Sequence, residues 1–456
     1  MKNTCLLALL FAILLGNSTF SQTKKWTLEE CVNYALKNNI SIKQSELDIQ
    51  VAAVAKKDAL ASFLPNVNAS TTHSWNIGLN QNITTGLLEN QTTQFTQVGL
   101  NSGVAIYNGL QNQNRFRRAN LSKVASEFQL SKMKDDVSLN VANAFLQILF
   151  NKENLKVQKE QLSNDEIQQK RSEELVAAGV IPRGDLLDMK ATVANDQQNV
   201  INAENNLFLS KLSLAQLLQL DDIQNFDIAD NDYEVKASAT MLEKPQVIVD
   251  KAKQERIELK IAKSNLDIAE SDLKIAKGAY QPSLNGFYSF STRASNSDRI
   301  IRDEAGNLLV QSALPIFDQF SEFKGHNFGF NLQIPIFNGF TVKNNVERSR
   351  IALERNKTIL KQTEQDLERN VYTAITNAKG AINSYEAAAA SLEARKEAFN
   401  YAKERFAVGM MNSFDFNQSQ TLYANAQSEV LRTKYDSIFK VKIVEFYFGI
   451  PITNRN

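Results

Sequence analysis

Two stretches of the sequence decide the fold, and they are copies of each other. Residues 99–109 read GLNSGVAIYNG, and residues 329–339 read GFNLQIPIFNG, 230 positions later. Apolar and polar residues alternate in both, so a strand formed by either stretch has one apolar and one polar face. Asn and Gly are frequent on the polar face. This favours a strand between lipid and a water-filled lumen over the alternative, a half-buried strand of a soluble sheet.

The repeat continues well beyond these strands. After each Asn-Gly dipeptide the offset of 230 holds without a gap, and before the strands an offset of 217 applies. The additional 13 residues of the second copy fall between Pro282 and Asn338, where a surface loop tolerates insertion. The chain is therefore predicted to be one structural unit, duplicated. Matching residues include Gly179 with Gly409, Asp185 with Asp415, and Pro65 with Pro282.

Each unit is predicted to contain a helix, two strands and a long helical hairpin. No Gly or Pro interrupts residues 110–178, and only Gly380 interrupts residues 340–408. Each stretch can therefore form a helix roughly 100 Å long at about 1.5 Å per residue. In the second stretch, apolar residues spaced alternately by 3 and 4, broken once at Arg395, indicate coiled-coil packing.

The expected boundaries follow from these patterns and from the polar, aperiodic residues between the two copies. They are a signal peptide at 1–21, a first repeat at 22–220 (helix 28–64, strand pair about 66–108, helical hairpin 110–220), a linker at 221–244, and a second repeat at 245–456 (helix 246–280, strand pair about 283–338, helical hairpin 340–450).

The N-terminus is typical of a secretory signal peptide. Lys2 precedes an apolar run at residues 6–15, and residues 19–21, TFS, match the small-residue pattern of a cleavage site. Cys5 lies inside this segment and no Cys directly follows the expected cleavage site, so a lipoprotein is not expected. The mature chain would keep only Cys31 and therefore no internal disulfide.

Composition and motifs exclude several classes of function. Lys and Arg number 51 against 50 Asp and Glu, a net charge of +1, which gives no basic surface for nucleic acid. The two histidines, His73 and His326, do not combine with Cys31 at any metal-ligand spacing. No phosphate-binding glycine loop, nucleophile elbow or H-E-x-x-H motif occurs. Neither an enzyme nor a cofactor is therefore expected.

The number of strands bears on the assembly. A sheet in lipid must close on itself to satisfy its backbone groups. Four strands cannot close around a lumen, because small closed barrels begin at about eight strands. The chain is therefore expected to oligomerise, and three copies would supply twelve strands.

The duplicated architecture, the apolar-aromatic-Asn-Gly strand ends and the two Gly-containing hairpin tips, each followed six residues later by Asp, together resemble the TolC-like outer membrane efflux protein family. The resemblance covers essentially the whole mature chain. It implies a mainly α fold with a transmembrane β-barrel, in which a homotrimer forms a 12-stranded barrel in the outer-membrane lipid and a helical tunnel through the periplasm.

The resemblance also implies partners. A periplasmic adaptor protein would dock at the hairpin tips and link the homotrimer to an inner-membrane efflux or secretion pump. The trimer would then be the passive exit duct for small molecules or polypeptides. The tip residues are Gly179, Val180, Gly409 and Met410.

A narrow periplasmic mouth is a further implication of the resemblance. In the family, two acidic residues three positions apart line it; here Asp415 fits and Gln418 departs. A mouth with one acidic ring is expected to be less selective for cations. The residues themselves leave another interpretation open, in which Asp185 and Asp415 cap their helices and the tip glycines only end theirs.

The family's mouth is held shut by a Tyr and an Arg beside the second tip, linked to an Asp after the first. The matching residues here are Phe406, Met411 and Asp185. Phe406 lacks the hydroxyl and Met411 lacks the charge, which puts this latch in doubt. Arg183 or Arg405 is the candidate replacement for the missing cation.

A second class of function remains open from the residues, a structural or adhesive coiled-coil protein of the envelope that transports nothing. Such a protein would not need hairpin tips duplicated in register, so the exit duct is favoured. The long loop at 293–325 is expected to face outward and has no assigned role. Neither the cargo nor the partner pump follows from the sequence.

Overall fold

The chain forms two compact units, each assembled from separate stretches of sequence. The computed structural model describes residues 25–81, 87–223, 225–230, 233, 235 and 238–451. Unit 1 comprises residues up to 47, 128–260 and 361 onward, and unit 2 comprises 48–127 and 261–360. The signal peptide predicted at 1–21 lies outside the described residues and stays a prediction.

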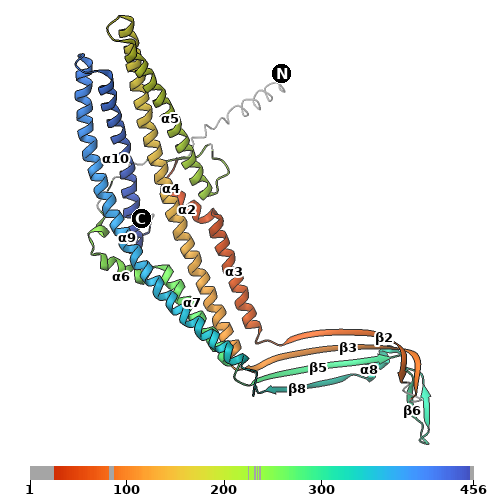
Figure 1. Ribbon diagram of the computed structural model, residues 1–456. Coiled ribbons are helices and arrows are strands. Elements are labelled where there is room, and N and C mark those ends of the chain that lie inside the picture. Colours follow the sequence, from red (N-terminus) through yellow and green to blue (C-terminus); the bar gives the residue numbers. More distant parts are fainter. Residues whose placement is uncertain are drawn as a thin grey trace, which may run out of the picture. The chain divides into compact units, whose positions relative to one another are not determined.

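Unit 2 contains a four-stranded antiparallel sheet with the order β2-β3-β5-β8 (Figure 1). Each repeat contributes one hairpin, and β3 of the first repeat pairs with β5 of the second. Both outer strands, β2 and β8, keep one edge without a partner strand among the described residues. The strands are β2 (Asn66–Gln81), β3 (Leu88–Asn108), β5 (Ser283–Ser295) and β8 (Gly325–Gln333).

Strand β8 is shorter than the alternating pattern predicts. The pattern continues through Ile336, yet β8 ends at Gln333. In the first repeat, β2 pairs with β3 only as far as Gly103, and residues 104–108 of β3 pair with β5 of the following repeat, except at a bulge at Ile106. Residues 334–338 occupy the equivalent place in the second repeat, and no strand among the described residues pairs with them. Pro335 also removes one backbone donor there.

Each helix that precedes the strands is broken in two, so the prediction of single helices at 28–64 and 246–280 is wrong. The breaks lie at Asn39 and Arg256, which are repeat mates at the offset of 217. Asn39 Oδ1 accepts the backbone N–H of Ser41, which satisfies a donor at the start of the next helix. The helices are α2 (Leu28–Asn38), α3 (Ile40–Ala61), α6 (Pro245–Glu255) and α7 (Ile257–Gly278).

Both broken positions are buried and anchored to the end of a returning helix. Asn39 Nδ2 donates to the carbonyl of Leu217 at 2.9 Å, and the Arg256 guanidinium stacks on the Phe446 ring at 3.9 Å. A buried polar group needs such partners. Asn is frequent at helix ends but Arg is not, so the two breaks share no signal in the sequence.

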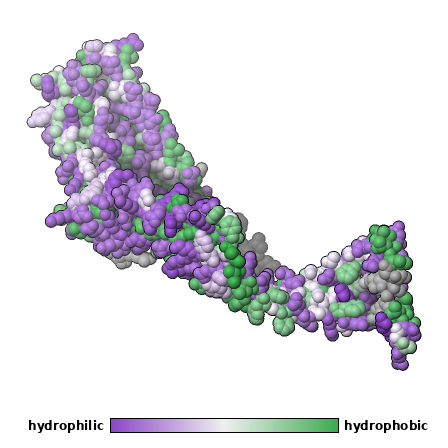
Figure 2. Space-filling model, turned by 60° about the horizontal axis from the view of Figure 1, so that its bottom comes forward, coloured by the Kyte–Doolittle hydropathy of each residue, from purple (hydrophilic) through white to green (hydrophobic). Residues whose placement is uncertain are grey.

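Two helical hairpins, α4–α5 and α9–α10, supply most of unit 1. The long helix of each has 67 residues and the returning helix 36. The face of the helices seen in Figure 2 is mostly hydrophilic, as expected where helices meet water. The bounds are α4 (Gln111–Ala177), α5 (Arg183–Leu218), α9 (Thr341–Ala407) and α10 (Ser413–Phe448). No helix among the described residues is long and apolar enough to cross a membrane.

Apolar side chains of both hairpins and of α2 form the core of unit 1. Phe145, Ile148, Leu214 and Leu218 are completely buried there. The predicted seam of α9 is buried at Leu367, Val371, Ala378, Ala381 and Ala402, and its other members are partly buried. Ile375, which is outside the predicted seam, is buried as well. The helices are therefore held together by a continuous apolar stripe, aided by Ala residues that allow close approach.

The segment between the repeats is more ordered than its aperiodic sequence suggests. Strand β4 (Asp227–Ile228) pairs in parallel with β1 (Lys25–Trp26), and a short 3₁₀ helix, η1 (Ala239–Leu242), follows. Lys152 lies 3.1 Å from the Asp227 carboxylate, and Lys211 lies 3.0 Å from it. Burial opposes ionisation, but hydrogen bonds from these lysines lower the pKa of Asp227 overall. Interactions distant in sequence therefore order this linker.

The loop at 293–325 in unit 2 also contains regular structure. It begins within the end of β5 and includes a small hairpin of β6 (Arg299–Arg302) and β7 (Leu308–Gln311), then helix α8 (Ile316–Glu322). The buried Gln319 on α8 donates to the carbonyl of Ser295 at 2.9 Å. This contact holds α8 against β5.

Candidate channel wall and tunnel mouth

The sheet of unit 2 has one polar and one apolar face across all four strands. Residues directly opposite each other in an antiparallel pair share a face. The register therefore places Asn68, Asn101, Ser289 and Asn327 in one row, one residue from each strand. Ser289 Oγ donates to Asn101 Oδ1 at 2.7 Å across the contact between the two repeats. This row is polar across all four strands.

The opposite face is apolar and exposed. One row on it contains Ala69, Leu100, Phe290 and His326, and the aromatic Phe328 and Phe330 of β8 lie on the same face. Each of these two phenylalanines is 76% exposed in the single chain. A soluble sheet would cover such residues, whereas a sheet with this face in lipid need not.

The two hairpin tips have the same backbone structure. Gly179 and Gly409 adopt φ values of +71° and +76°, which favour glycine. The next residue of each tip, Val180 or Met410, donates its N–H to a carbonyl five residues earlier, at 2.9 and 2.8 Å. Both tips are therefore Schellman motifs. Ending the helix is thus enough to account for the tip glycines, as the interpretation without adaptor docking predicts.

The tips expose large apolar side chains. Val180 is 66% exposed, and three residues of the second tip are 70% to 72% exposed. Burying such side chains is favourable, so tips of this kind suit an apolar contact with a partner. The three are Val408, Met410 and Phe414.

The predicted mouth residues lie in the first turn and a half of α10. Asn412 Oδ1 accepts the backbone N–H of Asp415 at 2.8 Å, and Asn412 Nδ2 donates to the Asp415 carboxylate at 3.0 Å. Asp415 therefore supports the start of its helix, where an acidic group is favourable. The N-cap of α10 is Asn412 and not Asp415, and both Asp415 and Gln418 are exposed.

The predicted latch residues are not brought together within one chain. Phe406 stacks on Phe416 of its own hairpin, with ring centroids 4.5 Å apart. Arg405 donates to the Met410 carbonyl at 3.4 Å. Among the described residues, no hydrogen bond or ion pair joins the side chain of Asp185 to Arg183, Arg405 or Met411. The latch stays a prediction.

Sequence reasoning missed a buried polar cluster between the hairpins. Asp165 of α4 is 1% exposed and accepts a hydrogen bond from Gln420 of α10 at 2.6 Å and one from Gln161 at 2.8 Å. Burial, and next a hydrogen bond with Asp165, raise the pKa of Asp196 on α5 to about 8. The repeat held a signal for this cluster, because Asp165 is the mate of Arg395, which interrupts the seam.

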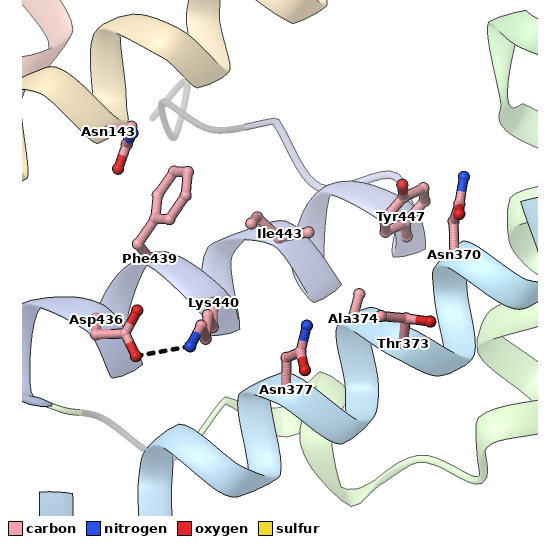
Figure 3. A pocket seen from close by; sticks show the side chains of 10 residues that line it. All are labelled: Asn143, Asn370, Thr373, Ala374, Asn377, Asp436, Phe439, Lys440, Ile443 and Tyr447. Atoms are coloured by element: carbon pink, nitrogen blue, oxygen red, sulfur yellow. Dashed lines mark hydrogen bonds and ion pairs between the residues drawn. The ribbon is translucent and has the colours of Figure 1, made fainter. Parts of the chain in front are cut away.

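A polar groove lies between α4, α9 and α10 in unit 1. Figure 3 shows Asn143 of α4 facing Phe439 of α10, with Asn370 and Asn377 of α9 on the other side. Its volume is about 450 Å³. No convergent charged group points to a bound ligand, since Lys440 is already paired with Asp436 at 2.7 Å. Within the described residues, no three His, Cys, Asp or Glu side chains gather as a metal site.

The two-faced sheet, the duplicated hairpins and the paired tips define a class of outer-membrane channel. The family model for outer membrane efflux proteins matches residues 31–219 and 248–438, and the chain belongs to this family. Members of the family are channels of the outer membrane and not enzymes. The predictions of family, outer-membrane location and a non-enzymatic role are therefore confirmed.

Individual relatives share modest sequence identity but the same fold. The pyoverdine export outer membrane protein OpmQ of Pseudomonas aeruginosa is 22% identical over 314 residues, which span 66% of the chain and 65% of OpmQ. The CmeC outer membrane channel of Campylobacter jejuni matches with a TM-score of 0.77 at 20% identity, covering 92% of the chain and 85% of CmeC. The outer membrane protein VceC of Vibrio cholerae matches with a TM-score of 0.76 at 13% identity, covering 92% of the chain and 96% of VceC. The predicted fold class is therefore confirmed.

Proposed function

We propose that three copies of the chain form an exit duct that crosses the outer membrane and continues through the periplasm. The observation that carries the proposal is the polar row of Asn68, Asn101, Ser289 and Asn327 on a sheet whose other face is apolar. Three such sheets closed into a barrel would direct the polar rows into a water-filled lumen and the apolar faces into lipid. The duct would carry small molecules or polypeptides delivered by a periplasmic adaptor and an inner-membrane pump.

The alternative function, an envelope coiled coil without transport, accounts for the helices but not for the sheet. Such a protein has no use for a row of polar residues that continues across all four strands. OpmQ carries export in its name, and CmeC is described as a channel. Both agree with a duct.

The mouth of the duct is proposed at Asp415 and Gln418, at the start of α10. Both are exposed and lie about one helical turn apart, so in a trimer each would form a ring of three side chains. A single acidic ring attracts cations, and its effect falls as salt screens it. Asp185 would help to close the mouth only if it paired with Arg183 or Arg405 of a neighbouring chain.

Single-channel conductance in a planar bilayer tests the duct and its mouth together. We expect small currents with weak cation preference, which Asp415→Ala lowers and Gln418→Asp raises. Asn101→Asp places a further acidic ring in the wall and should also raise cation preference, whereas the uncharged Asn101→Gln should not. Absence of current from an inserted trimer would favour the structural alternative. If neither Asp415→Ala nor Gln418→Asp changes the current or the cation preference, only the assignment of the mouth residues is wrong.

Adaptor docking is proposed at the apolar tips, where Val180 and Met410 are exposed. Met410→Asp should weaken recovery of a periplasmic partner after cross-linking in cells, because a charge opposes an apolar contact. Leu242→Asp is the matched control, since Leu242 is 85% exposed and distant in sequence from both tips. Equal loss with both variants, or with neither, would argue against docking at the tips.

A further inference from the structure

We infer the register in which neighbouring copies join: β8 of one copy pairs with β2 of the next so that Asn331 lies opposite Thr72. This inference rests on the proposed ring of three copies and adds the residue pairs of its seam. The free edges of β2 and β8 are the surfaces that pair. An uncovered edge is a template for another strand, and a second copy of the chain supplies the matching one.

The first step is the contact between repeats within one chain. There, β3 of the first repeat pairs with β5 of the second, with Asn101 opposite Ser289 and Leu100 opposite Phe290. The Asn101 and Ser289 side chains are hydrogen-bonded at 2.7 Å. In a closed ring, contacts between repeats of one chain alternate with contacts between neighbouring copies. We therefore take the β3–β5 pairing within the chain as the template for the β8–β2 pairing between copies.

The second step shows that registers transfer between the repeats. In the first hairpin, Ala69 lies opposite Leu100. Their repeat mates, at offsets of 217 and 230, are Gly286 and Phe330, and these lie opposite each other in the second hairpin. The two sequence offsets therefore convert a strand pairing of the first repeat into the observed strand pairing of the second repeat.

The third step applies the same offsets to the internal seam. Asn101 becomes Asn331 and Ser289 becomes Thr72, which gives the proposed pair. The neighbouring pairs follow in the same way, and each joins two residues on the same face of the sheet. On the polar face Asn327 lies opposite Asn76; on the apolar face Phe330 lies opposite His73, and Phe328 lies opposite Trp75. A slip by one residue would instead place apolar residues against polar ones.

The helices give independent support for the same neighbour. Phe208 and Leu209 of α5 are 55% and 58% exposed, whereas their repeat mates Ile438 and Phe439 on α10 are partly buried. Figure 3 shows Phe439 facing Asn143 of α4. The mate of Asn143 is Thr373 on α9, so α9 of the neighbouring copy would cover Leu209. The sheet and the helices therefore favour the same arrangement, in which the second repeat of one copy lies beside the first repeat of the next copy.

Disulfide trapping in the full-length trimer tests the register. The variant Thr72→Cys/Asn331→Cys should form covalent dimers and trimers on oxidation, because its side chains lie at the distance of the Asn101 and Ser289 pair. Two matched controls keep Asn331→Cys and move the partner by two residues on the same face, to Ser70→Cys or Ser74→Cys. These should cross-link about tenfold less.

The outcomes separate this inference from the proposed function. More efficient cross-linking of either control pair would overturn the register while leaving the ring of copies in place. Native mass spectrometry of the unmodified protein reports the number of copies independently. A trimer that conducts but shows no cross-link in any of the three variants would overturn the β2–β8 seam alone. A monomer without conductance would overturn the proposed function itself.

Discussion

At the scale of single residues, the most informative side chain is Asp196, which the sequence patterns did not single out. Its ordinary pKa is 3.8, and burial beside Asp165 raises the pKa to about 8. The folded chain therefore holds this proton between about pH 4 and pH 8, where an unfolded chain has released it. Because the folded state binds more protons in this window, its stability falls as the pH rises through it.

The substitution Asp196→Asn should remove this dependence. We expect the thermal midpoint of the unchanged protein to fall relative to that of the variant as the pH rises from about 5 to about 8. Asp188→Asn, at an exposed position of the same helix, is the control and should leave the dependence intact. Parallel midpoints for Asp196→Asn and the unchanged protein would show that the proton is not held there.

At the scale of elements, the sequence predicts the helices and strands well because their causes are local. Each long helix has 67 residues without Pro, and the alternation of apolar and polar residues occurs in both repeats. These patterns predict helices and strands directly. The errors arise where a distant partner decides. Asn39 ends α2 because Leu217 offers a carbonyl, and Asp227 orders the linker because Lys152 and Lys211 lie beside it. No local pattern carries such information.

The candidate site divides in the same way. The tip glycines, the exposed Asp415 and the two faces of the sheet were predictable, since each depends on spacing within one element. The cluster of Asp165, Asp196 and Gln420 was not, because three helices meet there. The sequence indicates this cluster only through the charged residues Asp165 and Arg395, which occupy the same position of the helical apolar seam in the two repeats.

At the scale of the whole molecule, the duplication makes each repeat a control for the other. Equivalent surfaces that differ in exposure identify what a single chain leaves uncovered. In the proposed ring of copies, the face of α5 at Leu209 would contact the neighbouring copy, whereas Phe439 at the matching position of α10 is partly buried within its own chain. Substitutions at these mates should therefore have different effects, although the positions are equivalent.

We expect Leu209→Ser to weaken the trimer and leave the fold of each chain intact, because 58% of this residue is already exposed without a neighbour. Phe439→Ser should instead destabilise the chain by about 1–3 kcal/mol, since it removes packing within the hairpins. Native mass spectrometry would report trimer loss, and circular dichroism during heating would report chain stability. If Leu209→Ser lowered chain stability as much as Phe439→Ser while trimers persisted, the exposed face of α5 would not be an intermolecular surface. The closed ring would then rest on the β2–β8 seam alone.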